Sequence, residues 1–366
     1  MTKQLRVGII GFAHMHIIAN AKVFARHPQV KITACADTIP DQPDVCEEVY
    51  SRKWNQEYLV EKLGIPNVYS NYSEMLEKEK LDIALVTSEN DQHVDVVEAC
   101  ARHKVHVCVE KPMSVSLVDA QRMNDACQKN NVLLVTNWPV AWSPVAHHIK
   151  SLIEQNKIGR VLEIKWRGGH TGPLGNAAVH PGLQEKLGQV SEAKLASTWW
   201  HQKQAGGGAL LDYCCYGAML SRWYYGCQAD SVSAVATNLA SPWGDADDNA
   251  IVIIHFPESI ALVEGSWTTL SHGTATGPII YGTSGTLVAD FKANSITLDR
   301  GEENQEAIQP ETLPEKNRDL ATHMIEHLES GHPLLPILSH DFNLEVMAIL
   351  DAATQSAARR KTTTLK

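Results

Sequence analysis

The chain has 366 residues, of which 44% are hydrophobic and 20% charged, a composition ordinary for a soluble globular protein with room for two domains. Its net charge of −10 argues against a nucleic acid or an anionic membrane surface as a partner. No apolar run reaches the length of a membrane span, so no membrane partner is expected.

Strand-like and helix-like segments alternate from residue 1 to about residue 136. The expected strands are Leu5–Ile10, Val30–Ala36, Leu81–Thr87, Val105–Val109 and Val132–Thr136. The expected helices are Met15–Arg26, Gln92–His103 and one that begins at Ser116, whose cap is paired with Asp119. Strands separated by helices of this length predict an α/β fold, here a doubly wound parallel sheet forming a Rossmann domain over residues 1–136.

The pattern changes after residues 137–143, where Asn137, Pro139 and Pro144 interrupt regular structure. A helix is expected at Pro144–Gln155, then strands with short turns, then two terminal helices. The strands are Val161–Arg167, Ser231–Asn238, Ala250–Phe256, Ile260–Thr269, Pro278–Tyr281 and Thr286–Ala289, and the helices are Asp319–Glu329 and Phe342–Ala358. This order predicts an α+β domain over residues 137–366 with a large, mostly antiparallel open sheet. The terminal helices are candidates to pack back on the first domain.

A candidate nucleotide-binding turn follows the first strand and opens a helix, which is the position of the fingerprint G-x-G-x-x-G. Gly11 would make the tight turn, and the helix N-terminus would present N–H groups and a positive dipole end to a pyrophosphate. Ala13 and His16 occupy the second and third glycine positions, so the motif alone is weak. The expected cofactor contacts on this turn are Gly11, Phe12, Ala13, His14 and Met15.

Asp37 strengthens the nucleotide prediction because it ends the second strand, 26 residues after Gly11. An acidic residue there binds the ribose hydroxyls of an adenosine and repels a 2′-phosphate, so NAD is favoured over NADP. A solvated aspartate at a strand end is the alternative explanation.

Glu110-Lys111-Pro112 closes the apolar run Val105–Val109. A lysine at the carboxyl end of a parallel strand lies where ligands bind in open α/β sheets, and lysine resists burial without a partner. Taken alone, the triplet is better explained by a surface lysine that follows a strand.

A second candidate site lies in the glycine-rich segment 206–217, which is typical of a loop entering a helix. Asp212 and Tyr216 are four residues apart and would share one helical face. An acid and a phenol on a mostly apolar helix are costly to bury unless they meet partners. An exposed polar stripe is the alternative for this pair.

The cysteines and histidines predict neither disulfides nor a metal site. None of the eight cysteines forms a C-x-x-C pair, so we expect reduced thiols in a cytoplasmic protein. His14 and His16 lack the carboxylate or cysteine companions of a convincing metal site, and no metal is expected. These histidines also interrupt the apolar stretch after Lys3 and Arg6, which argues against a signal peptide.

Three ordered motifs together resemble the Gfo/Idh/MocA oxidoreductase family: the turn after the first strand, Glu110-Lys111-Pro112, and Gly206–Asp212. The resemblance covers nearly the whole chain, including a last helix at Glu345–Ala357. It implies a Rossmann domain followed by an α+β domain whose open sheet forms subunit interfaces, and hence a homodimer or homotetramer.

The resemblance also implies roles for individual residues. Lys111, with a cis bond to Pro112, corresponds to the catalytic lysine on the nicotinamide side, and Glu110 to its neighbour in the nicotinamide pocket. Asp212 corresponds to the helix aspartate. Tyr216 stands where many members carry a histidine as the acid/base. In this it resembles the glucose–fructose oxidoreductase and dihydrodiol dehydrogenase branches, which carry a tyrosine there. The catalytic candidates are therefore Lys111, Asp212 and Tyr216.

Further contacts follow from the same resemblance. The loop after the fourth strand would line the cofactor through Thr87, Ser88, Asn90 and His93, and Asn137 would lie beside it. The substrate would meet Lys111, Asp212 and Tyr216 together with Trp142 and His170, and segments 170–173 and 199–201 are candidates to line its cleft.

Oxidation of a secondary alcohol needs a hydride acceptor, which NAD supplies, and a proton acceptor. Tyr216, whose ordinary pKa is near ~10, is a poor base at neutral pH, and an adjacent Lys111 ammonium would lower that pKa. We therefore predict an NAD-dependent oxidoreductase acting on a secondary hydroxyl or ketone of a sugar, cyclitol or related polyol.

Two other functions stay open at this point. One is an NAD-dependent glycosidase that acts by transient oxidation, without net redox change. The other is a non-catalytic nucleotide-sensing regulator, against which the presence of Lys111 and Asp212 argues. The sequence names neither the substrate, nor the direction of the reaction, nor the oligomer size.

Overall fold

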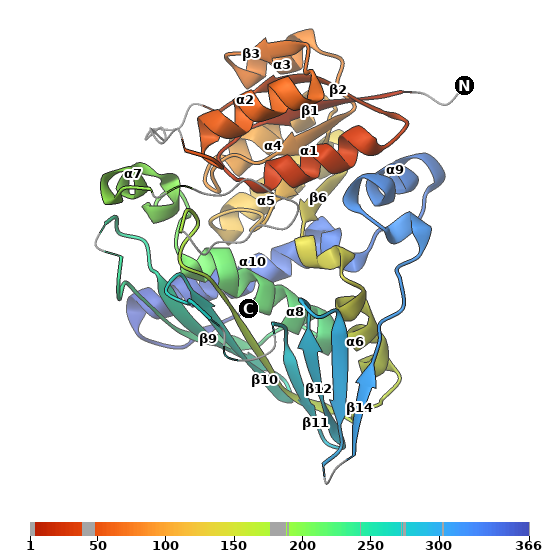
Figure 1. Cartoon of the computed structure of the whole chain (residues 1–366), viewed down its shortest axis with the longest axis vertical. Helices are drawn as coiled ribbons and strands as arrows, with labels where there is room; N and C mark the ends of the chain where they lie inside the picture. The colour runs from red at the N-terminus through yellow and green to blue at the C-terminus, as the bar shows by residue number, and fades with distance from the viewer. Residues whose placement is uncertain are drawn as a thin grey trace.

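A computed structural model of the chain describes residues 4–38, 48–175, 188, 190–241, 243–271, 273, 276–301 and 304–365. It has two sheets, one in the N-terminal third and one in the remainder, with the long C-terminal helix lying between them (Figure 1). The predicted fold class is confirmed.

The N-terminal sheet has six parallel strands in the order β3-β2-β1-β4-β5-β6, the order of a dinucleotide-binding Rossmann fold. Its strands are β1 (Leu5–Ile10), β2 (Val30–Ala36), β3 (Asn67–Tyr69), β4 (Ile83–Val86), β5 (His106–Glu110) and β6 (Leu134–Asn137). The helices between them are α1 (His16–Arg26), α2 (Arg52–Leu63), α3 (Tyr72–Lys78), α4 (His93–Arg102) and α5 (Leu117–Asn130).

Local sequence explains where these elements begin and end. The central strands β1 and β4 are almost wholly buried and apolar, as expected for strands covered on both faces. Helix α5 begins where the sequence predicts, because the Ser116 hydroxyl accepts a hydrogen bond from the Asp119 N–H at 3.1 Å. Helix α2 ends at Gly64, which has the left-handed φ of +61° that a C-cap glycine adopts.

The second sheet has nine strands in the order β14-β13-β12-β11-β7-β10-β9-β8-β15. Their bounds are β7 (Val161–Gly169), β8 (Ser231–Thr237), β9 (Asn249–Phe256), β10 (Ser259–Ser266), β11 (Ile279–Gly282), β12 (Gly285–Asp290), β13 (Ser295–Asp299), β14 (Gln305–Ile308) and β15 (Thr363–Thr364). Every neighbouring pair is antiparallel except β7 and β10. The predicted mostly antiparallel sheet is confirmed.

Helices cover one face of this sheet. They are α6 (Pro144–Glu154), α8 (Cys215–Tyr225) and α10 (His340–Arg359), and α7 (Glu192–Ser197) and α9 (Leu320–Ser330) lie nearer the first sheet. The other face carries exposed aliphatic side chains: Val235, Ile251, Ile253 and Ile260. In β9 the pattern alternates strictly, with Ile251 and Ile253 outward and Val252 and Ile254 buried.

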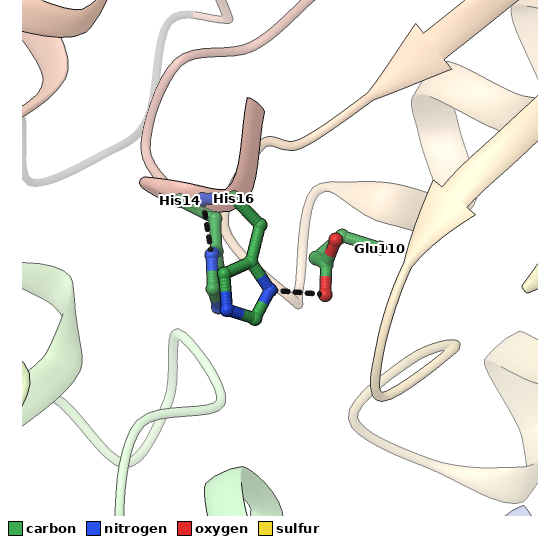
Figure 2. Close-up of side chains that lie close together, drawn as sticks. All are labelled: His14, His16 and Glu110. Atoms are coloured by element: carbon green, nitrogen blue, oxygen red, sulfur yellow. Dashed lines mark hydrogen bonds and ion pairs between the residues drawn. The ribbon is translucent and has the colours of Figure 1, made fainter. Parts of the chain in front are cut away.

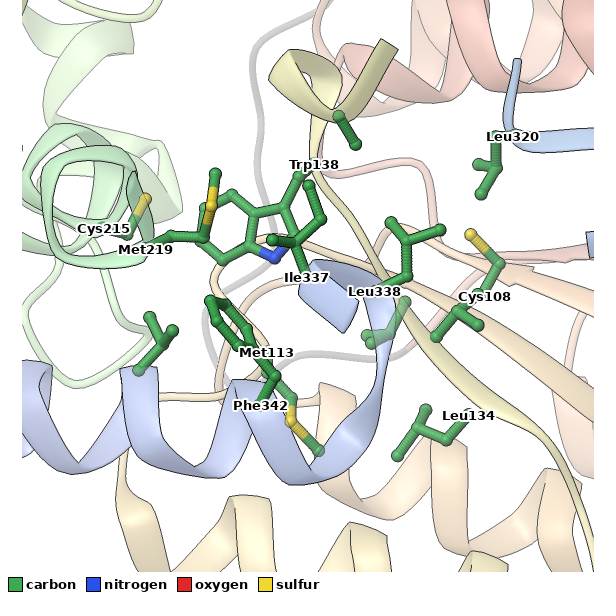
Figure 3. Packing of buried hydrophobic residues seen from close by; sticks show 14 of the residues in the cluster. Cys108, Met113, Leu134, Trp138, Cys215, Met219, Leu320, Ile337, Leu338 and Phe342 are labelled. Atoms are coloured by element: carbon green, nitrogen blue, oxygen red, sulfur yellow. The ribbon is translucent and has the colours of Figure 1, made fainter. Parts of the chain in front are cut away.

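One continuous hydrophobic core joins the two sheets. Figure 3 shows part of it, where Phe342 of α10 lies near Trp138 and Leu134 of β6 belongs to the same cluster. The Trp138 indole donates to Asn343 Oδ1 at 2.8 Å, and Val135 pairs with Ser339. Helix α9 contacts α1, and α10 contacts α5, so both terminal helices pack against the first sheet.

Two further observations concern the chain as a whole. In the part that the structure describes, no helix combines the length and apolar character that crossing a bilayer requires. The seven described cysteines are unpaired, and all but Cys227 are buried, whereas Cys46 lies outside the described residues.

Candidate active site

The turn between β1 and α1 packs closely against the backbone that follows β4. Gly11 has a φ of +85°, and a Cβ there would lie 2.5 Å from the backbone nitrogen of Ser88. The Thr87 hydroxyl donates to the Gly11 carbonyl at 2.7 Å, and the His14 N–H donates to the Thr87 carbonyl at 3.1 Å. These bonds fix the turn against the end of β4.

The residues at this turn fit the dinucleotide that the sequence predicts. The helix N-terminus follows directly, Ala13 is small, and Ser88 Oγ is buried with no hydrogen-bond partner among the described residues. From the second half of the chain, the Trp199 indole donates to the Ala13 carbonyl at 3.1 Å, and the Trp200 ring lies 4.8 Å from that of His14. Segment 199–201 therefore covers the turn.

Asp37 lies at the end of β2, where the sequence places it, but it already has three partners. Its Oδ1 accepts from the N–H groups of Phe12 and Thr38 at 3.2 and 2.9 Å, and from Arg52 Nη1 at 2.5 Å. The buried Arg52 also pairs with the buried carboxylate of Glu89. The sequence did not predict this ion cluster, because Arg52 belongs to no motif and Glu89, although it lies in the loop after β4, is not among the expected contacts.

Lys111 and Asp212 form the central ion pair of the site. Lys111 follows β5 and is only 2% exposed, and its Nζ donates to Asp212 Oδ1 at 2.7 Å and to the Asp212 carbonyl at 3.0 Å. The Lys111–Pro112 bond is cis, as predicted. Two residues 101 positions apart, one beside each sheet, thus meet in one place.

Mutual attraction keeps both members of this pair charged. Burial alone would lower the pKa of Lys111, but Asp212, Tyr216 and Glu110 outweigh it and hold that pKa well above its ordinary value. Burial alone would raise the pKa of Asp212, but Lys111 and His170 lower it below the usual range. The Trp267 indole donates to Asp212 Oδ2 at 3.0 Å and fixes the carboxylate.

Tyr216 lies beside the pair, but with a geometry that the sequence did not predict. Lys111 Nζ lies 4.8 Å from the centroid of the Tyr216 ring. Burial raises the pKa of the phenol, and Lys111 offsets only part of that increase. Lys111 lowers the pKa of Tyr216 as expected, but desolvation is the larger effect, so the phenol does not become the stronger acid that the sequence predicts.

The glycine-rich loop leads into one π-helical turn, Leu210–Cys214, before α8 begins. The wider turn also brings Tyr213 to the site, where its ring meets His170 edge-on at 5.2 Å. Tyr213 and Trp267 are the site residues that sequence reasoning missed. The only signal for Tyr213 is its position next to Asp212, and nothing in the sequence marks Trp267.

These side chains surround a pocket of about 50 Å³, far smaller than the ~300–1,000 Å³ typical of ligand pockets. Its lining consists of His14, Met15, His16, Lys111, His170, Pro173, Trp200, Asp212, Tyr213 and Tyr216. The structure therefore brings together the predicted catalytic residues, His170 and part of segments 170–173 and 199–201. Trp142 is not among the lining residues, and its ring lies 5.9 Å from that of His323.

The remaining predicted cofactor residues support the loops around the pocket. Asn90 Nδ2 donates to the Gly206 carbonyl at 2.8 Å and links the β4 loop to the glycine-rich loop. His93 is buried, with its Nδ1 3.2 Å from the Met113 carbonyl. Asn137 donates to Glu110 Oε2 at 3.1 Å.

The carboxylate of Glu110 lies beside His16, contrary to the expectation that the two histidines lack a carboxylate companion. Its Oε1 lies 2.9 Å from His16 Nδ1, and the ring of His14 lies beside that of His16 (Figure 2). The expectation that His14 and His16 have no carboxylate companion is therefore wrong. No local pattern indicates this contact, because Glu110 is 94 residues from His16.

Comparison with known families gives two matches along the chain. Residues 5–138 match the model described as "Oxidoreductase family, NAD-binding Rossmann fold", and residues 146–288 match the GFO/IDH/MocA C-terminal domain. Together the two matches cover well over half of the chain.

Individual relatives are more distant. A myo-inositol 2-dehydrogenase of Thermotoga maritima is 27% identical over 236 residues, which is 63% of each chain. A trans-1,2-dihydrobenzene-1,2-diol dehydrogenase of Xenopus tropicalis is 28% identical over 153 residues, 42% of this chain and 40% of the relative. Both alignments span less than two thirds of the curated relatives.

Among solved structures, a levoglucosan dehydrogenase in complex with NADH and levoglucosan superposes with a TM-score of 0.76. It is 19% identical and covers 99% of both chains. At this identity the likeness establishes the fold.

Proposed function

Because this chain belongs to the Gfo/Idh/MocA family of oxidoreductases with an NAD-binding Rossmann fold, we propose that it transfers a hydride between NAD and a secondary hydroxyl or ketone of a sugar, cyclitol or related polyol. The observation that carries the proposal is the buried Lys111–Asp212 pair at the carboxyl end of β5. The inositol, dihydrodiol and levoglucosan dehydrogenases among its relatives support this substrate class.

The cofactor would be held by the β1–α1 turn, the end of β2 and the loop after β4. The pyrophosphate would approach the backbone at Gly11, Ala13 and Ser88, and the ribose of the adenosine would contact Asp37. Asn90, His93, Glu110 and Asn137 support the walls of the nicotinamide side. When bound, NAD accepts or returns the hydride.

Lys111 stabilises negative charge on the reacting oxygen. Its ammonium has three N–H donors, of which Asp212 takes two, so the third can serve a substrate oxygen. Asp212 keeps the lysine charged and oriented, and Trp267 holds Asp212 in place. Negative charge develops on the reacting oxygen in both directions of the reaction. A fixed ammonium beside it therefore lowers the activation free energy.

Tyr216 carries the proton. Since burial raises its pKa, the phenol is protonated at neutral pH and is ready to protonate the oxygen when a ketone is reduced. In the oxidation direction the hydroxyl proton must pass to the phenolate, so oxidation is favoured by alkaline pH.

We propose that residues 1–136 form the cofactor part and residues 137–366 the substrate and assembly part. The aliphatic outer face of the second sheet supports a homodimer or homotetramer that buries this face. Light scattering on the purified chain, compared with an Ile251→Lys/Ile253→Lys variant, tests the assembly. A monomeric wild type would refute it.

The activity is tested with a panel of cyclitols, aldoses, ketoses and dihydrodiols in the presence of NAD. We expect NADH to accumulate with at least one of them, and a Lys111→Met variant to accumulate none. If NAD binds tightly but no member of the panel is oxidised, and no ketone analogue is reduced, the proposed function is refuted.

A further inference from the structure

Three side chains with metal-binding chemistry converge at the edge of the pocket. His14 and His16 come from the β1–α1 turn and Glu110 from the end of β5, as Figure 2 shows. One candidate ligand atom from each residue lies within 4.8 Å of the other two. Ligand atoms in a tetrahedral zinc site lie roughly 3.3 Å apart, so small side-chain rotations would close the set on an ion.

We propose that His14, His16 and Glu110 form a binding site for a divalent transition-metal ion of the zinc type. Two imidazoles and one carboxylate are a donor set that suits zinc, cobalt or iron(II), whereas magnesium and calcium prefer oxygen donors alone. Three protein ligands leave at least one coordination position for water or for an oxygen of a bound molecule.

The carboxylate is positioned in the way that metal ligands commonly are. Glu110 Oε2 accepts hydrogen bonds from Asn20 Nδ2 at 3.3 Å and from Asn137 Nδ2 at 3.1 Å, and Asn137 also donates to Asn20 Oδ1 at 3.1 Å. These bonds occupy one oxygen and leave Oε1 directed at His16. Such outer bonds orient a ligand before the ion arrives.

The histidines are held from the opposite side. His14 Nδ1 accepts from the His16 N–H at 3.2 Å, and its ring meets the ring of Trp200 edge-on at 4.8 Å. The rings of His14 and His16 lie 4.2 Å apart at an angle of 47°. Both are therefore fixed on a rigid turn between a buried strand and a helix.

The charge of the surroundings favours a cation. Glu110 is buried, and its carboxylate contacts His16, Asn20 and Asn137. The ion pair of Lys111 and Asp212 follows it directly, since Lys111 is the next residue in the chain. Glu110, Lys111 and Asp212 thus contribute two carboxylates and one ammonium to a site with little access to water. A divalent metal ion would compensate the excess negative charge.

The site opens toward the pocket that holds Lys111, Asp212 and Tyr216. An ion bound there would offer its open position to the same cavity that we propose for the substrate. The proposed metal site depends only on its three ligands, so a measurement of metal binding tests it independently of the proposed reaction.

The experiment is a metal titration of the full-length chain after treatment with a chelator. Cobalt is followed by its visible absorption and zinc by calorimetry. We expect one ion per chain, and at least tenfold weaker zinc binding in each of the variants His16→Gln and Glu110→Gln. His255→Gln, which removes an exposed histidine of β9, is the matched control and should bind as the wild type does.

The buried Glu110 substitution risks misfolding, so near-ultraviolet circular dichroism is recorded for each variant. A third variant, His14→Gln, keeps the test decisive if Glu110→Gln does not fold. Wild-type zinc affinity in His14→Gln and His16→Gln would overturn the proposal, as would the absence of stoichiometric binding. In that case His16 and Glu110 are only a hydrogen-bonded pair.

Discussion

At the scale of single residues, Lys111 is the side chain on which the proposed chemistry depends. It is buried, charged and bonded to Asp212, and the sequence places it at the end of a strand. Its contact with Asp212 could be predicted only through the resemblance of three motifs, because no local pattern connects residues 101 positions apart.

Lys111→Ala should lower kcat by at least on the order of 10²–10³ while leaving the dissociation constant of NAD nearly unchanged. The interaction lost is strongest when negative charge develops on the oxygen, and the cofactor is held mainly by other residues. Steady-state kinetics and fluorescence titration with NAD measure the two quantities.

The control for Lys111→Ala addresses stability. Removing one partner of a buried ion pair costs about 3–5 kcal/mol, because the other charge stays buried alone. The double variant Lys111→Met/Asp212→Asn removes both charges and should regain much of that stability while staying inactive. Recovery of activity in the double variant would contradict the role of Lys111.

Tyr216→Phe should slow turnover by on the order of 10²–10⁴ if the phenol carries the proton. Because burial raises the phenol pKa, oxidation by the wild type should accelerate as pH increases through the alkaline range. The variant should lose this dependence, which rate measurements against pH would reveal. Tyr216→His should retain activity. A fully active Tyr216→Phe would assign the proton transfer to Lys111 or a water.

Some residues of the site lie beyond sequence reasoning for a physical reason. Trp267 reaches Asp212 because it follows the end of β10. Tyr213 reaches the pocket because a π-helical turn precedes α8. His16 meets Glu110 because two parallel strands end at the same edge. Each contact depends on packing between distant segments.

At the scale of elements, the residues at the end of β2 bear on the preference for NAD or NADP. Asp37 was predicted to repel a 2′-phosphate, but the structure places the Arg52 guanidinium directly against it. An arginine at this place can accommodate a 2′-phosphate, so Asp37 and Arg52 act in opposite directions.

Asp37→Ser should weaken NAD binding more than NADP binding, shifting the ratio of the two dissociation constants by about tenfold, equivalent to about 1.4 kcal/mol. The substitution removes a ribose acceptor and frees Arg52 for a phosphate. Calorimetric titrations with both cofactors measure the ratio. Asp95→Ser, an exposed change on α4, is the control. Equal affinity of the wild type for NAD and NADP would contradict the prediction.

The elements themselves were predictable to different degrees. Leu5–Ile10 and Val30–Ala36 have the bounds that the sequence predicts, because each is a short apolar run between polar residues. Helix α2 was not predicted, since its apolar residues show almost no helical periodicity, and β14 was not predicted because it is largely exposed and polar.

At the scale of the whole molecule, three buried histidines link stability to pH. Burial lowers the pKa of His93, His201 and His323 to about 4, from an ordinary 6.5. Below about pH 6.5 the unfolded chain therefore binds protons that the folded chain does not, and stability decreases as the pH falls toward 4.

We expect the urea concentration at half-unfolding to be lower at about pH 5 than at pH 7.5. Each histidine contributes at most roughly 2 kcal/mol to the difference between these two pH values. His201→Gln should make the midpoint less sensitive to pH, since one titrating group is removed. An equal midpoint at both pH values in the wild type would contradict the prediction.

The position of α10 has a consequence for recombination between relatives. This helix is encoded at the end of the chain, yet it packs on α5 and fixes Trp138 through Asn343. In a hybrid that takes only its first 136 residues from a second parent, those residues would therefore pack against an α10 from the first parent. Breakpoints that transplant α10 together with the N-terminal segment preserve these contacts, so functional chimeras of this architecture should carry both ends from one parent.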